Sequence, residues 1–333
     1  MKLFGPEHER VLLSLYGDAA SEFDDLLRSF SAVLEAKVLP LSLGLDQGKG
    51  DIAETRRVLF DQGLSKLSYP ERYGGLALPF GVYALAMELA GAADASTAMS
   101  IGIHNTVADA IAQFGSEEQR RRLLPSLLSG EKLAAFALTE PSSGSDARSM
   151  STRAAKDGKY FVLDGSKMFI TNAGEADVYL VFASTPGGHS AFLVEGSNSG
   201  LKVGSPLREK LGMRGSHTAE VRLERCHVAA EDSLLGEEGA GFEGAKKLLD
   251  SSRVIMGMIC VGIARTAYLK ALAYSRSREL FGKKLSDFQL TREKLADGVI
   301  EKRISPALHA RGEAQGARAH VRVGGSPGEG ASD

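Results

Sequence analysis

The chain has 333 residues, of which 43% are hydrophobic and 25% charged, and its formal net charge at pH 7 is -2. This is the composition of a globular protein with enough apolar residues for more than one core. A nearly neutral chain has no general electrostatic attraction to nucleic acid or to anionic membranes, so neither is expected as its main partner.

The cysteines and the N-terminus indicate a cytoplasmic protein. Cys226 and Cys260 lie far apart and form no CxxC motif, so they do not indicate a disulfide framework. Residues 1–25 are acidic and lack the apolar run of a signal or transit peptide. The longest apolar run, residues 254–264, is shorter than the roughly 18 residues of a membrane span. We expect it to be a helix buried on all sides.

Residues 1–135 show helical periodicity and are expected to form an N-terminal helical domain. Val107, Ile111 and Phe114 share one helical face, and Gly115 ends that helix. Residues 116–119, Ser-Glu-Glu-Gln, fit a capping box that opens the next helix. The turn-rich residues 67–81 are expected to be a loop.

Residues 136–237 show the pattern of short strands. Asp-Gly at 157–158, between residues of strand type, predicts a hairpin, and further strands are expected at 178–184, 190–196 and 218–228. We expect a compact β-barrel or sandwich domain. His217 and His227 lie in or beside these strands and are expected to be surface or packing residues, because no histidine in the chain has the spacing of a metal site.

Residues 238–304 return to helical periodicity. A long apolar helix is expected from Phe242 and a second one from about Asp287. The fold class is therefore α+β and multidomain: helical domain, β domain, then a helical-bundle domain that is incomplete. Residues 305–333, rich in Ala, Gly and Arg and without an apolar stripe, are expected to be a disordered tail.

Two motif matches carry no function. Residues 239–244 fit G-x-G-x-x-G, but no buried strand precedes them, so a turn between domains is the better interpretation. Residues 324–328 fit G-x-S-x-G within the tail, where no helix follows, and we attribute that match to chance.

Four segments, in chain order, resemble the acyl-CoA dehydrogenase family. They are FALTEPSSGSD at 136–146, GSKMFITNAGEADVYL at 165–180, LGMRGSHT at 211–218 and RELFGKKLSDFQL at 278–290. The resemblance covers about residues 5–297. It implies an FAD-dependent enzyme that dehydrogenates an acyl-CoA thioester between its α and β carbons, with an electron-transfer flavoprotein as the electron acceptor.

The residue types of the first two segments suit a flavin. An isoalloxazine ring needs backbone N–H groups and small hydroxyls at its polar edge and apolar side chains against its face. Taken alone, the first segment also fits a plain Ser/Gly turn, and the second segment in register favours the cofactor site. The resemblance implies that Thr171 bonds the reactive edge and that Ser145 reaches both flavin and CoA ester, while Gly144 allows close backbone approach. The expected flavin-binding residues are Phe136, Leu138, Thr139, Gly144, Ser145, Phe169, Ile170 and Thr171.

The resemblance also implies contacts between subunits and with the substrate. Four residues, Arg278, Phe281, Phe288 and Gln289, are similar to those that contact the FAD of a neighbouring subunit, which implies a dimer or tetramer. An arginine fork matches two pyrophosphate oxygens, although a helix-end arginine also caps carbonyls or faces water. Asp250 and Arg253 match the substrate-contacting pair of the family, or form only a local ion pair on one helix.

No residue of this chain is assigned as the catalytic base. The family reaction needs a glutamate close to the thioester. Most members carry it far toward the C-terminus, beyond the resemblance, and a minority carry it at the position of Ser252, which cannot act as a base. Glu140 belongs to the flavin side. Three interpretations stay open: an enzyme with a truncated or frame-shifted C-terminus, a non-catalytic subunit of a hetero-oligomer, and an acyl-CoA oxidase-like flavoprotein. The acyl chain is not indicated.

Overall fold

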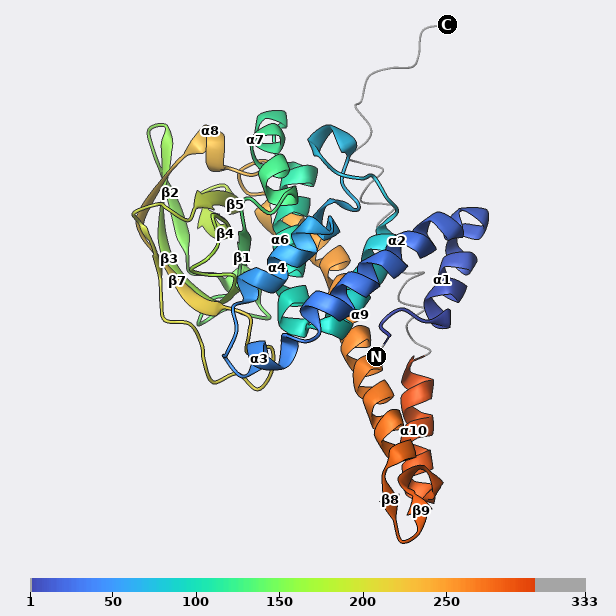
Figure 1. Ribbon diagram of the computed structural model, residues 1–333. Helices are drawn as coiled ribbons and strands as arrows, with labels where there is room; N and C mark the ends of the chain where they lie inside the picture. The colour runs from blue at the N-terminus through green and yellow to red at the C-terminus, as the bar shows by residue number, and fades with distance from the viewer. Residues whose placement is uncertain (1, 303–333) are drawn as a thin grey trace, which may run out of the picture.

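The computed structural model describes the backbone of residues 2–302 and the side chains of residues 2–298. Helices, a sheet and a second group of helices follow one another along the chain, as the sequence predicts (Figure 1). The expected disordered tail at 305–333, with the G-x-S-x-G match inside it, lies outside the described residues.

Seven α-helices, with short 3-10 and π-helical turns between them, form the described N-terminal part. They are α1 (Pro6–Tyr16), α2 (Ala20–Val33), α3 (Ser42–Asp46), α4 (Ile52–Asp61), α5 (Phe80–Ala93), α6 (Ala95–Phe114) and α7 (Glu117–Leu128). The predicted capping box is confirmed, because Ser116 Oγ accepts from Gln119 N and Gln119 Oε1 accepts from Ser116 N. These reciprocal bonds fix the start of α7 directly after Gly115 ends α6.

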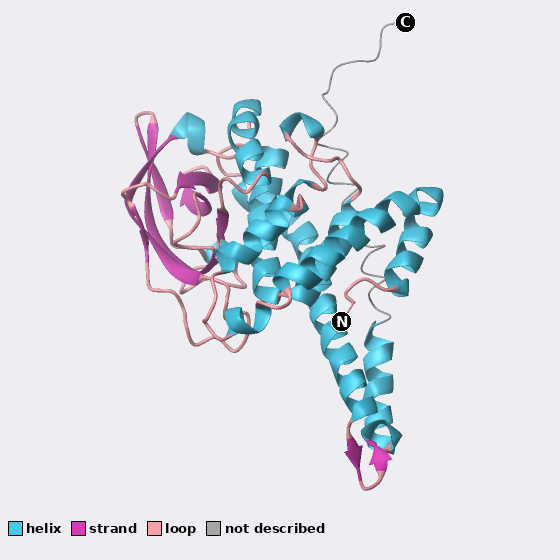
Figure 2. Cartoon of the chain, viewed as in Figure 1, coloured by secondary structure: helices cyan, strands magenta, loops and turns pink. Residues whose placement is uncertain are grey.

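The β domain is one curled mixed sheet (Figure 2). Its strands are β1 (Ala134–Ala137), β2 (Arg153–Asp157), β3 (Tyr160–Thr171), β4 (Val178–Thr185), β5 (Gly188–Glu195), β6 (Leu201–Val203) and β7 (Thr218–Ala229). The order is β1-β4-β2-β3-β7-β6, and β5 pairs with β4. The predicted hairpin is confirmed, with Gly158 at φ 60° between β2 and β3. The strand β1 runs parallel to β4 and joins this sheet to the helices.

The C-terminal part consists of α8 (Ala230–Ser233), α9 (Gly241–Ser277), a small hairpin of β8 (Glu279–Leu280) and β9 (Lys283–Lys284), and α10 (Gln289–Lys302). Two glycines let α9 approach α5 closely. A Cβ on Gly91 would lie 2.7 Å from Ile259 O, and one on Gly262 would lie 2.1 Å from Glu88 O. The first half of α9 therefore packs against α5 and α6, while its second half and α10 extend side by side to the β8–β9 tip (Figure 1).

The apolar run at 254–264 is not buried on all sides, and that prediction was wrong. Val254, Ile255, Met258 and Ile259 are buried in the helical core, whereas Cys260 is exposed and Ile263 is 37% exposed. The helical period brings only one face of the run against α5 and α6. Among the described helices, α9 alone is long and apolar enough to cross a membrane by length and composition, which core helices of soluble proteins also satisfy.

Candidate functional site

The first flavin segment begins on β1, whose side chains alternate between two surroundings. Ala135 and Ala137 belong to the core inside the sheet. Phe136 and Leu138 point the other way and pack against the cluster shared by the sheet, α6, α7 and α9. The Phe136 ring lies 5.2 Å from that of Phe182. Because successive strand residues face opposite sides, the two apolar residues expected at the flavin face the junction with the helices.

The structure brings the first and second flavin segments into direct contact. Met168 N donates to Thr139 O at 2.8 Å. The Lys167 ammonium, which is fully buried, donates to Leu138 O at 3.1 Å and to Glu140 Oε1 at 2.8 Å. A lysine in the middle of β3 therefore clamps the loop that follows β1.

Glu140 is the residue of this loop whose carboxylate accepts a hydrogen bond from the buried Lys167 ammonium. Burial alone would raise its pKa, but hydrogen bonds from Lys167, from Ser151 and from Thr152 outweigh burial and lower the pKa to about 2. Its side chain is 0% exposed. A carboxylate that is locked in this way stays charged and cannot move to a substrate carbon, so Glu140 is a structural group and not a base.

The second flavin segment ends β3 with an irregular backbone. The register against β7 shifts between Lys167 and Ile170, and Phe169 within this bulge has φ +61° and is 57% exposed. A positive φ is a strained conformation for an aromatic residue, and such strain is concentrated at functional sites. The Ile170 side chain is buried in the sheet core at 2% exposure, so only its backbone remains available to a ligand.

The polar groups of the two segments match what a flavin requires. The hydroxyls of Thr139, Ser145 and Thr171 make no hydrogen bond to any other described residue. Gly144 is exposed, and a Cβ there would meet nothing nearer than Thr139 Cγ2 at 3.9 Å. The fold itself therefore places no demand for glycine at this position. Three hydroxyls without a partner among the described residues, together with the exposed Phe169 ring, are the kinds of groups that suit the edge and face of an isoalloxazine.

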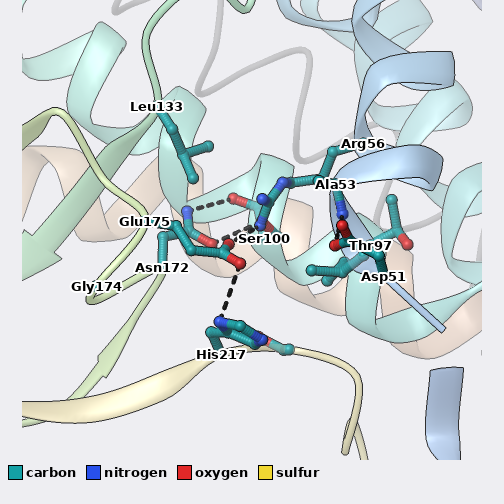
Figure 3. Close-up of polar contacts among 12 residues, drawn as sticks. Asp51, Ala53, Arg56, Thr97, Ser100, Leu133, Asn172, Gly174, Glu175 and His217 are labelled. Carbon is teal, nitrogen blue, oxygen red and sulfur yellow. Dashed lines mark hydrogen bonds and ion pairs between the residues drawn. The ribbon is translucent and has the colours of Figure 1, made fainter. Parts of the chain in front are cut away.

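A second group of contacts joins the end of β3 to the helices (Figure 3). Asn172 is fully buried and bonds Ser100 of α6, while Arg56 of α4 forms an ion pair with Glu175. Glu175 also accepts from His217 at 2.9 Å. The His217 side chain is 45% exposed, which agrees with the prediction of a surface residue.

The residues expected at the substrate lie on α9. Asp250 and Arg253 form an ion pair with each other and are both exposed, so the local pair that the sequence left open is present. Ser252 is half-buried and its Oγ accepts from Thr106 Oγ of α6 at 3.3 Å. That hydroxyl therefore belongs to the contact between the two helices.

An aromatic and basic cluster lies at the start of α9, beside the first flavin segment. The Arg148 guanidinium is 4.7 Å from the centre of the Phe242 ring, and the Lys246 ammonium is 5.2 Å from it. The His189 ring is 6.1 Å away. Arg148 belongs to the turn that follows Ser145, so the cluster joins the flavin loop to the helix.

The four residues expected at a neighbouring FAD lie far from the flavin segments of their own chain. Arg278, Phe281, Phe288 and Gln289 surround the β8–β9 hairpin at the end of the α9–α10 arm, away from the sheet (Figure 1). Phe281 is 94% exposed and has φ +53°. Within one chain these residues cannot take part in the site formed by β1 and β3.

Comparisons with known proteins agree with this arrangement. The family models for the acyl-CoA dehydrogenase N-terminal, middle and C-terminal domains match residues 20–131, 135–226 and 239–318. The chain belongs to the acyl-CoA dehydrogenase family. Human mitochondrial short-chain specific acyl-CoA dehydrogenase is 38% identical over 278 residues, which are 82% of this chain and 67% of the human protein.

Two solved structures share the acyl-CoA dehydrogenase fold. Butyryl-CoA dehydrogenase from Megasphaera elsdenii aligns with a TM-score of 0.83 at 33% identity, over 90% of this chain and 83% of its own. An acyl-CoA dehydrogenase complexed with FAD from Bacillus anthracis aligns with a TM-score of 0.84 at 30% identity, over 97% of this chain and 58% of its own. FAD is therefore the cofactor of this flavoprotein family, and the donor set on β1 and β3 fits it.

Three residues that hold the site together were not predicted as site residues. Lys167 and Asn172 lie within the second quoted segment, but a lysine in a strand and an asparagine after it carry no sequence signal of burial. His104, fully buried in α6, gave no signal either. The flavin segments were predicted from a family resemblance with which their residue types agree, whereas these three side chains bond mainly to the protein's own backbone.

Proposed function

We propose that this chain is an FAD-binding acyl-CoA dehydrogenase subunit that acts on an acyl-CoA thioester. Bound FAD supplies the acceptor for a hydride from the β carbon. The chain's own residues hold the ring: Thr139 and Thr171 offer hydroxyls at its edge, and Phe136 and Phe169 offer apolar surface. One observation carries the proposal, namely that Lys167 and Met168 fasten the two flavin segments to each other.

A CoA thioester carries phosphates, which a chain of net charge -2 must meet with local basic groups. The cluster of Arg148 and Lys246 around Phe242 supports this part of the proposal, because it combines two cations with an aromatic surface directly beside the flavin loop. Asp250 and Arg253, two turns further along α9, extend the polar surface on the same helix.

We further propose that the chain works as an oligomer in the cytoplasm and passes electrons to an electron-transfer flavoprotein. Support for an oligomer comes from the exposed tip of the arm, where Arg278 and Phe281 cannot reach the FAD of their own chain. The electron acceptor follows from the family. Support for a reducing compartment comes from Cys226 and Cys260, which are both unpaired.

The proton acceptor is not among the residues assigned above. Glu140 is locked with a pKa of about 2, and Ser252 has no basic group. The purified chain is therefore expected to bind FAD and acyl-CoA but to show little or no bleaching of the flavin on anaerobic addition of butyryl-CoA or octanoyl-CoA.

Titration of the purified chain with FAD, followed by quenching of flavin fluorescence, tests the proposal. We expect saturable binding that weakens in Thr171→Val and is unchanged in Ser199→Ala, which alters an exposed β-domain hydroxyl. Binding of CoA is expected to weaken in Arg148→Ala and to remain unchanged in Arg222→Ala. A folded wild-type chain that binds no FAD would refute the proposal.

A further inference from the structure

The strand that carries the first flavin segment has one free edge. Within the described sheet, β1 pairs with β4 alone. A free edge leaves backbone groups without strand partners, and buried backbone groups must find other partners. On β1, side chains from elsewhere in the fold take that place.

Ala134, the first residue of β1, is held on both of its backbone groups. Its N–H donates to His104 Nδ1 at 3.1 Å, and its carbonyl accepts from Asn172 Nδ2 at 2.9 Å. Further along the same segment, Leu138 O accepts from Lys167 and Thr139 O accepts from Met168 N. The stretch from Ala134 to Thr139 is therefore fixed at its beginning by two side chains and at its end by β3.

Asn172 makes the larger contribution, because it follows Thr171 directly and uses all of its polar atoms. Its Nδ2 donates to Ala134 O and to Ser100 O, its Oδ1 accepts from Ser100 Oγ at 2.6 Å, and its N–H donates to His217 O. The residue is 0% exposed and has φ +67°. A strained backbone conformation of this kind persists only where surrounding contacts determine it.

His104 completes the arrangement from α6. Its Nε2 bonds Leu127 O at 3.0 Å, so the ring donates there and leaves Nδ1 to accept from Ala134 N. The ring is also packed edge-on against Phe60 at 5.2 Å between centroids. Its orientation is thereby set from two sides.

We propose that Asn172 and His104 are positioning residues for the flavin: they fix the start of β1, two residues before the first flavin segment, and Asn172 ties it to the second segment just after the end of β3. Neither residue touches the ring. This inference rests on the proposed function, because it concerns the same cofactor. A residue that only filled the core would affect stability without affecting the bound flavin.

Two variants and one control test the inference through Asn172. Asn172→Gly keeps the left-handed backbone and removes the side-chain contacts. Ser100→Ala removes the 2.6 Å hydrogen bond to Asn172 Oδ1 and a long 3.5 Å contact from Arg56, keeps the bond from Asn172 to Ser100 O, and is the milder change. Arg225→Gly is the matched control, since Arg225 also has a positive φ, of 47°, but is exposed on β7.

The measurements are the dissociation constant for FAD, the visible spectrum of bound flavin and its midpoint potential, beside the melting temperature. We expect Asn172→Gly to raise the dissociation constant about tenfold or more and to shift the spectrum and potential, because misplaced supporting groups loosen a site. Ser100→Ala should change the same quantities less, and Arg225→Gly should not change them.

Wild-type binding, spectrum and potential in both Asn172→Gly and Ser100→Ala would overturn the inference, whatever their melting temperatures, while the proposed function would stand. If Asn172→Gly does not fold, Ser100→Ala decides by the same criteria. A folded wild-type chain that binds no FAD would refute the proposed function and this inference together.

Discussion

Removing the buried ammonium of Lys167 tests the clamp between the two flavin segments. In Lys167→Met, the fully buried Glu140 keeps its bonds from Ser151 and Thr152 but loses its only described cationic partner, and Leu138 O loses a donor. Breaking a buried pair from one side costs about 3–5 kcal/mol. Because part of the hydrogen bonding survives, we expect about 3 kcal/mol, or a melting temperature lower by roughly 5–10 °C.

The pH dependence of stability gives a second estimate of how much the ionised Glu140 contributes to the unfolding free energy. Its pKa falls from 4.5 to about 2 on folding, which corresponds to at most about 3 kcal/mol of stability. Since the folded-state pKa is the lower one, this stability is present above pH 4.5 and is lost as the pH falls toward 2. In Lys167→Met the pKa of Glu140 rises, so the variant has less of this pH-dependent stability to lose. The difference in unfolding free energy between wild type and variant should therefore become smaller as the pH is lowered from 7.

Melting followed by circular dichroism measures both effects. Lys156→Met, which alters an exposed lysine of β2, is the matched control and should melt as wild type. The double variant Lys167→Met/Glu140→Gln should recover part of the loss, because no uncompensated charge remains. A Lys167→Met variant that melts at the wild-type temperature, or a double variant less stable than the single one, would refute the reasoning.

Three further predictions follow from the same geometry. Burial, opposed by the bond to Leu127, lowers the pKa of His104 from 6.5 to about 4, so the unfolding free energy should decrease by about 3 kcal/mol from pH 6.5 to pH 4. His104→Gln should flatten the plot of unfolding free energy against pH in this range. An unchanged slope in the variant would contradict the prediction. Phe169→Gly should relieve a positive φ and leave the melting temperature equal or higher, yet weaken FAD binding in fluorescence titrations. Ser252→Glu should bleach the flavin with butyryl-CoA or octanoyl-CoA at least about tenfold faster than Ser252→Gln in anaerobic stopped flow, because a general base supplies about 10²–10⁴-fold; equal rates would exclude this position.

Much of the fold was predictable, because local patterns and tertiary structure agree over long stretches. The capping box at Ser116 and the hairpin at Gly158 depend on neighbouring residues alone, and both are confirmed. The exposed face of α9 was not predicted. Apolar residues at 260 and 263 resemble their buried neighbours in composition, and only the packing against α5 decides which of them is covered.

The candidate site divides in the same way. The segments that contain Thr139 and Thr171 could be predicted, because two segments in register resemble the family and their small hydroxyls suit a flavin; the first segment alone also fits a plain turn. Ile170 could not be separated from Phe169, since the bulge in β3 that turns one side chain outward and the other inward has no sequence signal. The roles of Lys167 and Asn172 depend on β1 lying beside β3, a contact between residues distant in the chain.

The contacts that shape the flavin segments are also the contacts between the helices and the sheet. Asn172 and Glu175, which follow β3 within the second segment, bind Ser100 and Arg56 of the helical domain. A ligand that stabilises the end of β3 therefore stabilises this junction too, and binding to the folded state adds RT ln(1 + [L]/Kd) to stability. Saturating FAD should consequently raise the melting temperature of the helices as well as that of the sheet. Arg56→Ala should weaken the coupling between the helices and the sheet. In hydrogen exchange, added FAD should then protect the sheet of this variant more than its helices.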